Sequence, residues 1–85
     1  MAKTVFTGPH KVLVAALVEA RKAAGLTQAQ VAARVGKDQS FMSLIEGSQR
    51  RVDVLEFYAL AKAMGADPVE LFRTVTAKLP EQVSI

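Results

Sequence analysis

The middle of the chain carries a group of uncharged polar side chains whose chemistry is hydrogen bonding. Gln39, Ser40 and Ser43 lie close together in the chain, and Gln28 precedes them. A glutamine amide both donates and accepts, so it can form two hydrogen bonds at once with the edge of an adenine. The serines lack a base to activate them as nucleophiles, because the single histidine, His10, lies far away near the N-terminus. These residues predict recognition rather than catalysis.

Several function classes are excluded by what the 85 residues lack. The chain has no cysteine, which removes disulfide frameworks and thiolate metal sites and fits a reducing cytoplasm. It also has no glycine-rich phosphate loop and no metal-ligand spacing. A chain of this length forms a single domain around one core. We therefore expect a protein that is not an enzyme and that uses neither a metal nor a cofactor.

Charge is divided unevenly between the two halves of the chain. In total, 11 Lys and Arg against 8 Asp and Glu give a net charge of +3. Residues 1–51 carry 8 basic and 3 acidic side chains, a balance of +5, whereas residues 52–85 carry 3 basic and 5 acidic, a balance of −2. Clustered positive charge attracts phosphate, so the N-terminal half is the candidate for binding nucleic acid.

An apolar run from Val12 to Val18 follows two lysines and has to be distinguished from a targeting segment. The run is much shorter than the roughly 20 apolar residues that a membrane-spanning helix needs. The helical period also continues beyond it, through Glu19 and Arg21. We interpret the run as part of a buried helix and expect no membrane association.

Caps and stops divide the chain into five expected helices, and no strand pattern lies between them. The residues expected to open them are Gly8, Thr27, Asp38, Asp53 and Asp67. The residues expected to end them are Gly25, Gly36, Gly47, Gly65 and Pro80. The buried stripe expected on the fourth helix is Val54, Phe57, Ala61 and Met64. Residues 1–8 form an expected flexible arm, 9–79 the domain and 80–85 a tail, so the predicted fold is all-α.

The second and third helices are joined by only three residues, Gly36 to Asp38. So short a connection makes two helices cross steeply, which is the geometry of a helix-turn-helix, here at about residues 27–47. In that motif the first helix braces on the phosphate backbone and the second projects its exposed face into the major groove. The face that the third helix leaves unburied consists of Gln39, Ser40, Ser43 and Leu44.

Several motifs, over about residues 13–72, resemble the Cro/repressor-like (XRE) helix-turn-helix family. They are Gly25-Leu26-Thr27-Gln28, Val31-Ala32, Val35-Gly36, Gln39-Ser40-Phe41, Ser43, Ile45-Glu46, Arg50 to Phe57 and Leu60 to Gly65. The resemblance implies a compact five-helix bundle, a lambda-repressor-like DNA-binding domain, that binds operator DNA as a symmetric dimer. The function that follows is sequence-specific regulation of transcription, in the cytoplasm and associated with the nucleoid.

The resemblance also assigns base-reading roles by position. Gln39, Ser40 and Leu44 fall where the family reads base edges, and Ser43 falls where it contacts the backbone or a base. Position 44 is often basic in relatives, whereas leucine can offer only apolar contact to a thymine methyl. Recognition is therefore expected to be partly apolar.

Further roles implied by the resemblance lie outside the third helix. Gln28 corresponds to a side chain that donates to a DNA phosphate, helped by the helix dipole. Arg21 and Glu46 match a buried ion pair that ties the first helix to the end of the third. Arg50 and Arg51 lie in a loop that commonly contacts phosphates.

Two features of the charged and capping residues refine this interpretation. Because the recognition face is neutral, the attraction to phosphate is expected to come from Arg34, Lys37, Arg50 and Arg51. The family usually has one residue between the glutamate and the next glycine, whereas Gly47 here follows directly. The sequence therefore does not determine which residue caps the end of the third helix.

The fifth helix is the expected dimer contact. Its apolar stripe, which extends beyond what the bundle needs, is Leu71, Phe72, Val75 and Leu79. A homodimer would read an inverted repeat with half-sites about 34 to 36 Å apart. The alternative function is a protein-interaction module, such as an antitoxin-like or adaptor protein, that uses the same bundle mainly to bind a protein partner.

Overall fold

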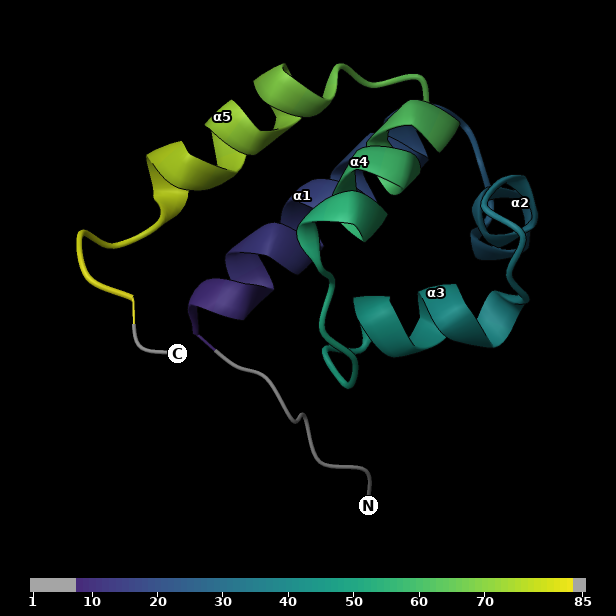
Figure 1. Cartoon of the computed structure of the whole chain (residues 1–85), viewed down its shortest axis with the longest axis horizontal. Coiled ribbons are helices and arrows are strands. Elements are labelled where there is room, and N and C mark those ends of the chain that lie inside the picture. The colour runs from purple at the N-terminus through teal and green to yellow at the C-terminus, as the bar shows by residue number, and fades with distance from the viewer. Residues whose placement is uncertain (1–7, 84–85) are drawn as a thin grey trace.

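The computed structural model describes residues 8–83 of the chain (Figure 1). These residues form five α-helices joined by short loops, with no strand among them. The helices are α1 (Pro9–Ala23), α2 (Gln28–Arg34), α3 (Gln39–Glu46), α4 (Val54–Ala63) and α5 (Pro68–Lys78). The predicted all-α fold is confirmed. The expected arm lies outside these residues except for Gly8. Within residues 8–83, no helix is long and apolar enough to cross a membrane.

Side-chain caps start four of these helices at the predicted residues. Thr27 Oγ1 accepts a hydrogen bond from the backbone N–H of Gln30 at 3.1 Å, and Gln30 Oε1 accepts one from the N–H of Thr27 at 2.9 Å. Asp53 and Glu56 form the same reciprocal box before α4. The other two side-chain caps are Asp38 for α3 and Asp67 for α5. Local sequence therefore determines where these helices begin.

The turn between α2 and α3 is closed by two backbone hydrogen bonds past the end of α2. The N–H of Lys37 donates to Ala32 O at 2.9 Å, and that of Gly36 donates to Ala33 O at 3.1 Å. Gly36 has a φ of 73°, a left-handed conformation that glycine adopts without steric cost. Figure 1 shows the result, with α2 seen nearly end-on beside α3.

The loop after α3 closes in the same way, with a serine where the other turns have glycine. The N–H of Gln49 donates to Leu44 O at 2.9 Å, and that of Ser48 bonds three residues back at 3.0 Å. Because Gly47 comes one residue early, it occupies the C-cap at φ −83°, and Ser48 takes the left-handed position at φ 57°. The capping arrangement that the sequence left open is therefore a Schellman turn on a non-glycine residue.

The core cluster is built from apolar side chains of α1 to α4 and of the residue that caps the end of α4. Its members are Leu17, Val31, Ala32, Met42, Ile45, Phe57, Leu60 and Met64. One predicted core residue is wrong, because Val54 is the first residue of α4, lies beyond the edge of the core and is 82% exposed. The fifth helix was expected to include Leu79, but α5 ends one residue earlier, at Lys78. Leu79 has an extended backbone because it precedes Pro80.

α3 lies at one side of the bundle. α1 packs on α3, α4 and α5, while α2 packs on α3 and α4. In Figure 1, α1 and α4 occupy the middle, with α2 and α3 on one side and α5 on the other. The recognition-helix candidate and the fifth helix therefore present different surfaces.

Candidate nucleic-acid interface

The outer face of α3 exposes the side chains that the sequence placed there. Gln39, Ser40 and Ser43 are exposed, and Leu44 is 42% exposed. The hydroxyl of Ser40 donates to Oδ1 of the cap residue Asp38, which lowers the pKa of that carboxyl. Ser40 therefore keeps only its acceptor capacity for an outside group. The face is short, polar and uncharged, with one apolar side chain.

Two glutamine amides join α3 to the start of α2. Gln39 Nε2 donates to Gln28 Oε1 at 3.3 Å, and Gln28 Nε2 donates to Glu46 Oε1 at 2.9 Å. These bonds orient the amide of Gln39, and the carboxylate of Glu46 anchors the series. The structure thus brings together two side chains that the sequence assigned to separate roles.

Glu46 also forms the ion pair implied for Arg21. Nε of Arg21 lies 2.7 Å from Oε2 of Glu46, and Nη2 donates to Oε1 at 3.0 Å. A third donor, Nη1, binds Leu26 O at 2.9 Å. The two side chains are only 13% and 10% exposed, and the carboxylate raises the pKa of Arg21. A bidentate pair of this kind fixes α1 against the end of α3.

Arg50 is bound on two sides within the protein. Its Nη2 lies 2.7 Å from Oε2 of Glu56 and its Nη1 donates to Oε1 at 3.0 Å, which raises the pKa of Arg50 and lowers that of Glu56. Its Cζ lies 4.7 Å from the ring centroid of Phe41, and Nζ of Lys37 lies 5.8 Å from the same centroid. Two predicted phosphate contacts therefore share one aromatic ring.

His10 connects α1 to the same loop, which the sequence did not indicate. A hydrogen bond with the backbone of Arg50 holds its imidazole beside the loop. Burial and the charge of Arg51 lower the pKa of His10 by more than this bond raises it. No local signal could have shown this contact, because the two residues come from distant parts of the chain. Arg51 itself is exposed.

Arg34 has a partner within the protein that the sequence did not indicate. Its Nη1 donates to Ala63 O at 2.8 Å, so the guanidinium sits at the C-terminal end of α4. Cations are favoured there because the last carbonyls of a helix are unpaired and negative. Gln28, at the other end of α2, lies beside α3 instead. Arg34 is still exposed, so its predicted phosphate contact stays a prediction.

A second surface, the apolar face of α4 and α5, lies away from α3. Val54 is 82%, Val69 66%, Tyr58 54% and Phe72 49% exposed. These side chains line a groove of about 350 Å³. The ring of Phe72 packs edge-on against Phe57 at 5.6 Å between centroids. Exposed apolar side chains gathered on one face are typical of an interaction surface.

The predicted dimer stripe on the fifth helix is wrong in part. Val75 is 2% exposed and Leu71 packs against the core, because α5 lies on α1 and α4. Leu79 is half-buried. Only Phe72 of the four predicted side chains is well exposed. The outward apolar positions of α5 are therefore Val69 and Phe72.

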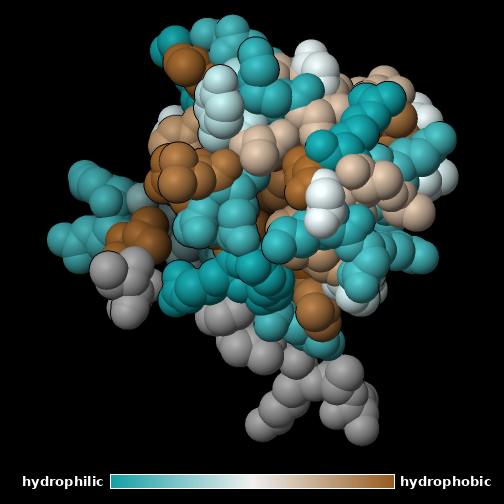
Figure 2. Space-filling model, turned by 45° about the vertical axis from the view of Figure 1, so that its right-hand side comes forward, coloured by the Kyte–Doolittle hydropathy of each residue, from teal (hydrophilic) through white to brown (hydrophobic). Residues whose placement is uncertain are grey.

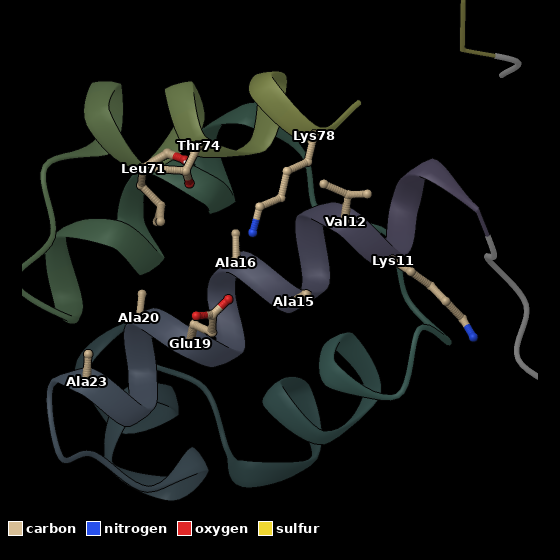
Figure 3. Close-up of a pocket in the computed structure, with 10 residues that line it drawn as sticks. All are labelled: Lys11, Val12, Ala15, Ala16, Glu19, Ala20, Ala23, Leu71, Thr74 and Lys78. Carbon is tan, nitrogen blue, oxygen red and sulfur yellow. The ribbon is translucent and has the colours of Figure 1, made fainter. Parts of the chain in front are cut away.

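A larger groove, of about 590 Å³, lies between α1 and α5 (Figure 3). Its floor is formed by small side chains of α1, including Ala16 and Ala20, and its α5 side by Leu71 and Thr74. No residue of α2 or α3 lines it.

The side of the molecule that carries α2 comes forward in Figure 2, where hydrophilic residues surround small, separate apolar patches.

Comparison with known proteins gives consistent matches over this region. The helix-turn-helix domain family matches residues 12–73. The uncharacterized HTH-type transcriptional regulator y4dJ of Sinorhizobium fredii (strain NBRC 101917 / NGR234) is 43% identical over 51 residues, which are 60% of this chain and only 66% of that protein.

Two solved structures share both fold and sequence with the chain. An XRE-family like protein from Pseudomonas syringae pv. tomato str. DC3000 is 43% identical, with a TM-score of 0.78 over 85% of this chain and 88% of that one. The restriction-modification controller protein C.AhdI from Aeromonas hydrophila is 35% identical, with a TM-score of 0.68 over 74% of this chain and 91% of that one.

Two crossing helices joined by a short turn, with the second exposed at the edge of the bundle, are the arrangement of helix-turn-helix DNA-binding domains. The family match and the sequence identity to these relatives narrow that class. The chain belongs to the XRE-type helix-turn-helix family, whose members are DNA-binding transcriptional regulators rather than enzymes.

Proposed function

We propose that this protein is a sequence-specific transcriptional regulator that places α3 in the major groove of double-stranded DNA. The observation that carries the proposal is the exposed polar face of α3, whose Gln39 is held through Gln28 by the partly buried pair of Arg21 and Glu46. A side chain that is already oriented loses little freedom on binding. Regulation would work by occupancy of promoter DNA on the nucleoid, in the cytoplasm.

The proposed base contacts come from four side chains with different chemistry. Gln39 donates to N7 and accepts from N6 of adenine, and Leu44 packs on a thymine methyl. Ser40 accepts a hydrogen bond, since its own proton is bound by Asp38. Ser43 contacts a base or the adjacent backbone. Together they favour an A·T-containing half-site over a G·C-rich one.

The proposed backbone contacts flank α3 at both ends. Gln28 offers its amide at the start of α2, and Lys37 lies in the turn that leads into α3. Arg51 lies in the loop that follows α3 and is exposed. Contacts of this kind fix the orientation of the protein on the duplex without carrying sequence information.

We further propose that the protein binds an inverted repeat as a homodimer through the apolar face of α4 and α5. The support for this proposal is that Val54, Tyr58, Val69 and Phe72 are exposed together along one groove, as at interaction surfaces. A twofold partner presents a second α3, so half-sites about 34 to 36 Å apart are expected. A small domain also gains stability from such a partner.

The decisive experiment selects bound genomic fragments and then titrates one variant on two duplexes. Gln39→Ala should weaken binding to the selected operator by about 1 to 3 kcal/mol, while binding to a scrambled duplex stays nearly unchanged. Gln82→Ala, an exposed glutamine in the tail, is the matched control and should change neither. Equal losses on both duplexes would show that Gln39 only positions the helix.

The apolar face of α4 and α5 also supports a second candidate function, a protein-interaction module with a different protein as its partner. The two candidates give different results when the tagged chain is used as bait. Specific promoter fragments support the regulator, whereas one stoichiometric protein and no enriched DNA support the module.

A further inference from the structure

Arg50 and Arg51 are adjacent basic residues in the same loop, but their side chains differ in exposure. Arg50 is partly buried, whereas Arg51 is exposed. The guanidinium of Arg50 donates three hydrogen bonds within the protein. Two go to the carboxylate of Glu56, and one goes to Arg51 O at 2.7 Å. Its side chain is 37% exposed and lies over the ring of Phe41. These contacts lie on one side chain of α3, one backbone group of the loop and one side chain of α4.

We infer that Arg50 is a positioning residue for DNA recognition and not a phosphate ligand, and that Phe41 and Glu56 hold it in that role. The inference rests on the proposed function and assigns a new role within it. Arg50, Phe41 and Glu56 form what we call the loop clamp. The clamp ties the recognition helix to the first turn of α4 across residues 47–53.

The charge balance around Arg50 supports this assignment. The carboxylate of Glu56 neutralises the guanidinium at 2.7 Å, and Lys37 is close enough to lower the pKa of the same carboxyl. A cation that is already paired adds little to the attraction of a distant phosphate. Arg51 has the more exposed side chain of the two, so we expect it to be the loop residue that contributes to counterion release.

The geometry of the clamp explains what it positions. Oε1 of Glu56 accepts from Nη1 of Arg50 and from the backbone N–H of Asp53, both at 3.0 Å. The cap of α4 and the loop are therefore held by one carboxylate. At the other end, the ring of Phe41 belongs to the first turn of α3, beside Gln39 and Ser40. Loss of the clamp would let the loop and the recognition helix move relative to each other.

Glu56→Gln tests the inference, because the two roles of Arg50 predict opposite results. Glutamine keeps the capping contact with Asp53 but removes the charge that holds Arg50. As a positioning residue, Arg50 is then loosened, so operator affinity should fall about threefold to tenfold while affinity for a scrambled duplex does not fall. If Arg50 is a phosphate ligand, it already contacts phosphate and the variant removes only a competing acid, so neither duplex should be bound more weakly. Unchanged or tighter operator binding by Glu56→Gln would therefore overturn the inference.

Arg51→Ala is the matched cation control. It should weaken both duplexes alike and make the slope of log affinity against log salt shallower by about 0.9. Arg50→Ala should instead leave the slope unchanged and weaken the operator selectively. A slope change with Arg50→Ala equal to that with Arg51→Ala would also overturn the inference.

Two variants at Phe41 and a measurement without DNA complete the test. Phe41→Leu keeps an apolar side chain but removes the ring face, whereas Phe41→Tyr keeps the ring. Amide hydrogen exchange of residues 48–52 should accelerate severalfold in Phe41→Leu and Glu56→Gln and stay at the wild-type rate in Phe41→Tyr. Unchanged exchange in the first two variants would overturn the clamp. If the wild type selects no DNA, the proposed function fails, and the exchange result still decides whether the clamp exists.

Discussion

The region of α2 and α3 and the region of α4 and α5 present opposite surfaces on one small bundle. Around α3, the exposed amide of Gln39 is connected through Gln28 to Glu46, a residue only 10% exposed. On α4 and α5, Val54 and Val69 are 82% and 66% exposed and apolar. The first surface is ordered for a polar ligand, and the second is suited to an apolar partner.

The difference shows how 85 residues can hold two binding surfaces without a second core. The polar surface is oriented by bonds that end in the interior, so its order depends on the fold of the isolated chain. The apolar surface lacks a comparable network, and its burial depends on a partner. Variants in the two regions should therefore change different quantities, folding stability in one and association in the other.

The largest expected effect is loss of folding stability when the interior anchor is removed. Glu46→Ala leaves the guanidinium of Arg21 partly buried and uncompensated, and it also removes the acceptor of Gln28. We expect a loss of about 3 kcal/mol in the free energy of unfolding, measured by urea denaturation. Glu70→Ala is the control, because its pair with Arg73 is 64 to 69% exposed and should contribute about 0 to 1 kcal/mol.

The second prediction separates two neighbouring residues of the apolar region. Val54 and Leu55 are 82% and 79% exposed, but only Val54 lines the groove between α4 and α5. Val54→Asp should weaken self-association by about 2 kcal/mol, or about thirtyfold, with folding stability nearly unchanged. Sedimentation of Leu55→Asp provides the comparison. Equal weakening by both variants, or a wild type that is monomeric with and without DNA, would refute the proposed dimer surface.

Much of the fold could be predicted from sequence because its signals are local. Thr27 with Gln30 and Asp53 with Glu56 are three residues apart, and each pair satisfies its own backbone donors. The short turn at Gly36 likewise needs only neighbouring residues. Helix starts and the crossing of α2 and α3 therefore follow from the order of residue types.

The errors and the contacts that the sequence missed involve residues far apart in the chain. Arg34 is basic and near the motif, but the carbonyl that it binds belongs to α4. Val75 continues an apolar stripe whose partner, core or dimer, depends on how α5 lies on α1 and α4. The pairing of Arg50 with Glu56 and Phe41 is of the same kind. Composition and spacing cannot reveal such partners, because each depends on the packed arrangement of helices.

A third, smaller effect is expected at the turn that ends α3. Ser48 holds a left-handed φ of 57°, whereas the equivalent turns after α1, α2 and α4 use glycine. Ser48→Gly should therefore increase the free energy of unfolding by about 1 kcal/mol. Ser43→Gly, in the interior of the same helix, should lower it by about the same amount. A loss of stability with Ser48→Gly would show that the buried serine side chain matters more than its backbone strain.

The smallest expected effect concerns acid, and it again distinguishes the two regions. The pairing with Arg50 lowers the pKa of Glu56 from its ordinary value of 4.5, so this carboxylate stabilises the folded state fully above pH 4.5. The stabilisation is lost as the pH falls below 4.5 and through the lowered folded pKa, because protonation breaks the pair. Since Arg50 is 37% exposed, the amount is about 0.2 to 1 kcal/mol.

Urea denaturation of wild type and Glu56→Gln between pH 7 and pH 3 measures this contribution. The variant should be less stable than wild type at pH 7, and the two should converge below pH 4.5, because only the wild type loses the ion pair. Glu70→Gln, whose pair with Arg73 on α5 is well exposed, should run parallel to wild type throughout. A constant gap between wild type and Glu56→Gln would mean that the contribution of Glu56 is independent of its charge, which would contradict the ion pair with Arg50 as its source.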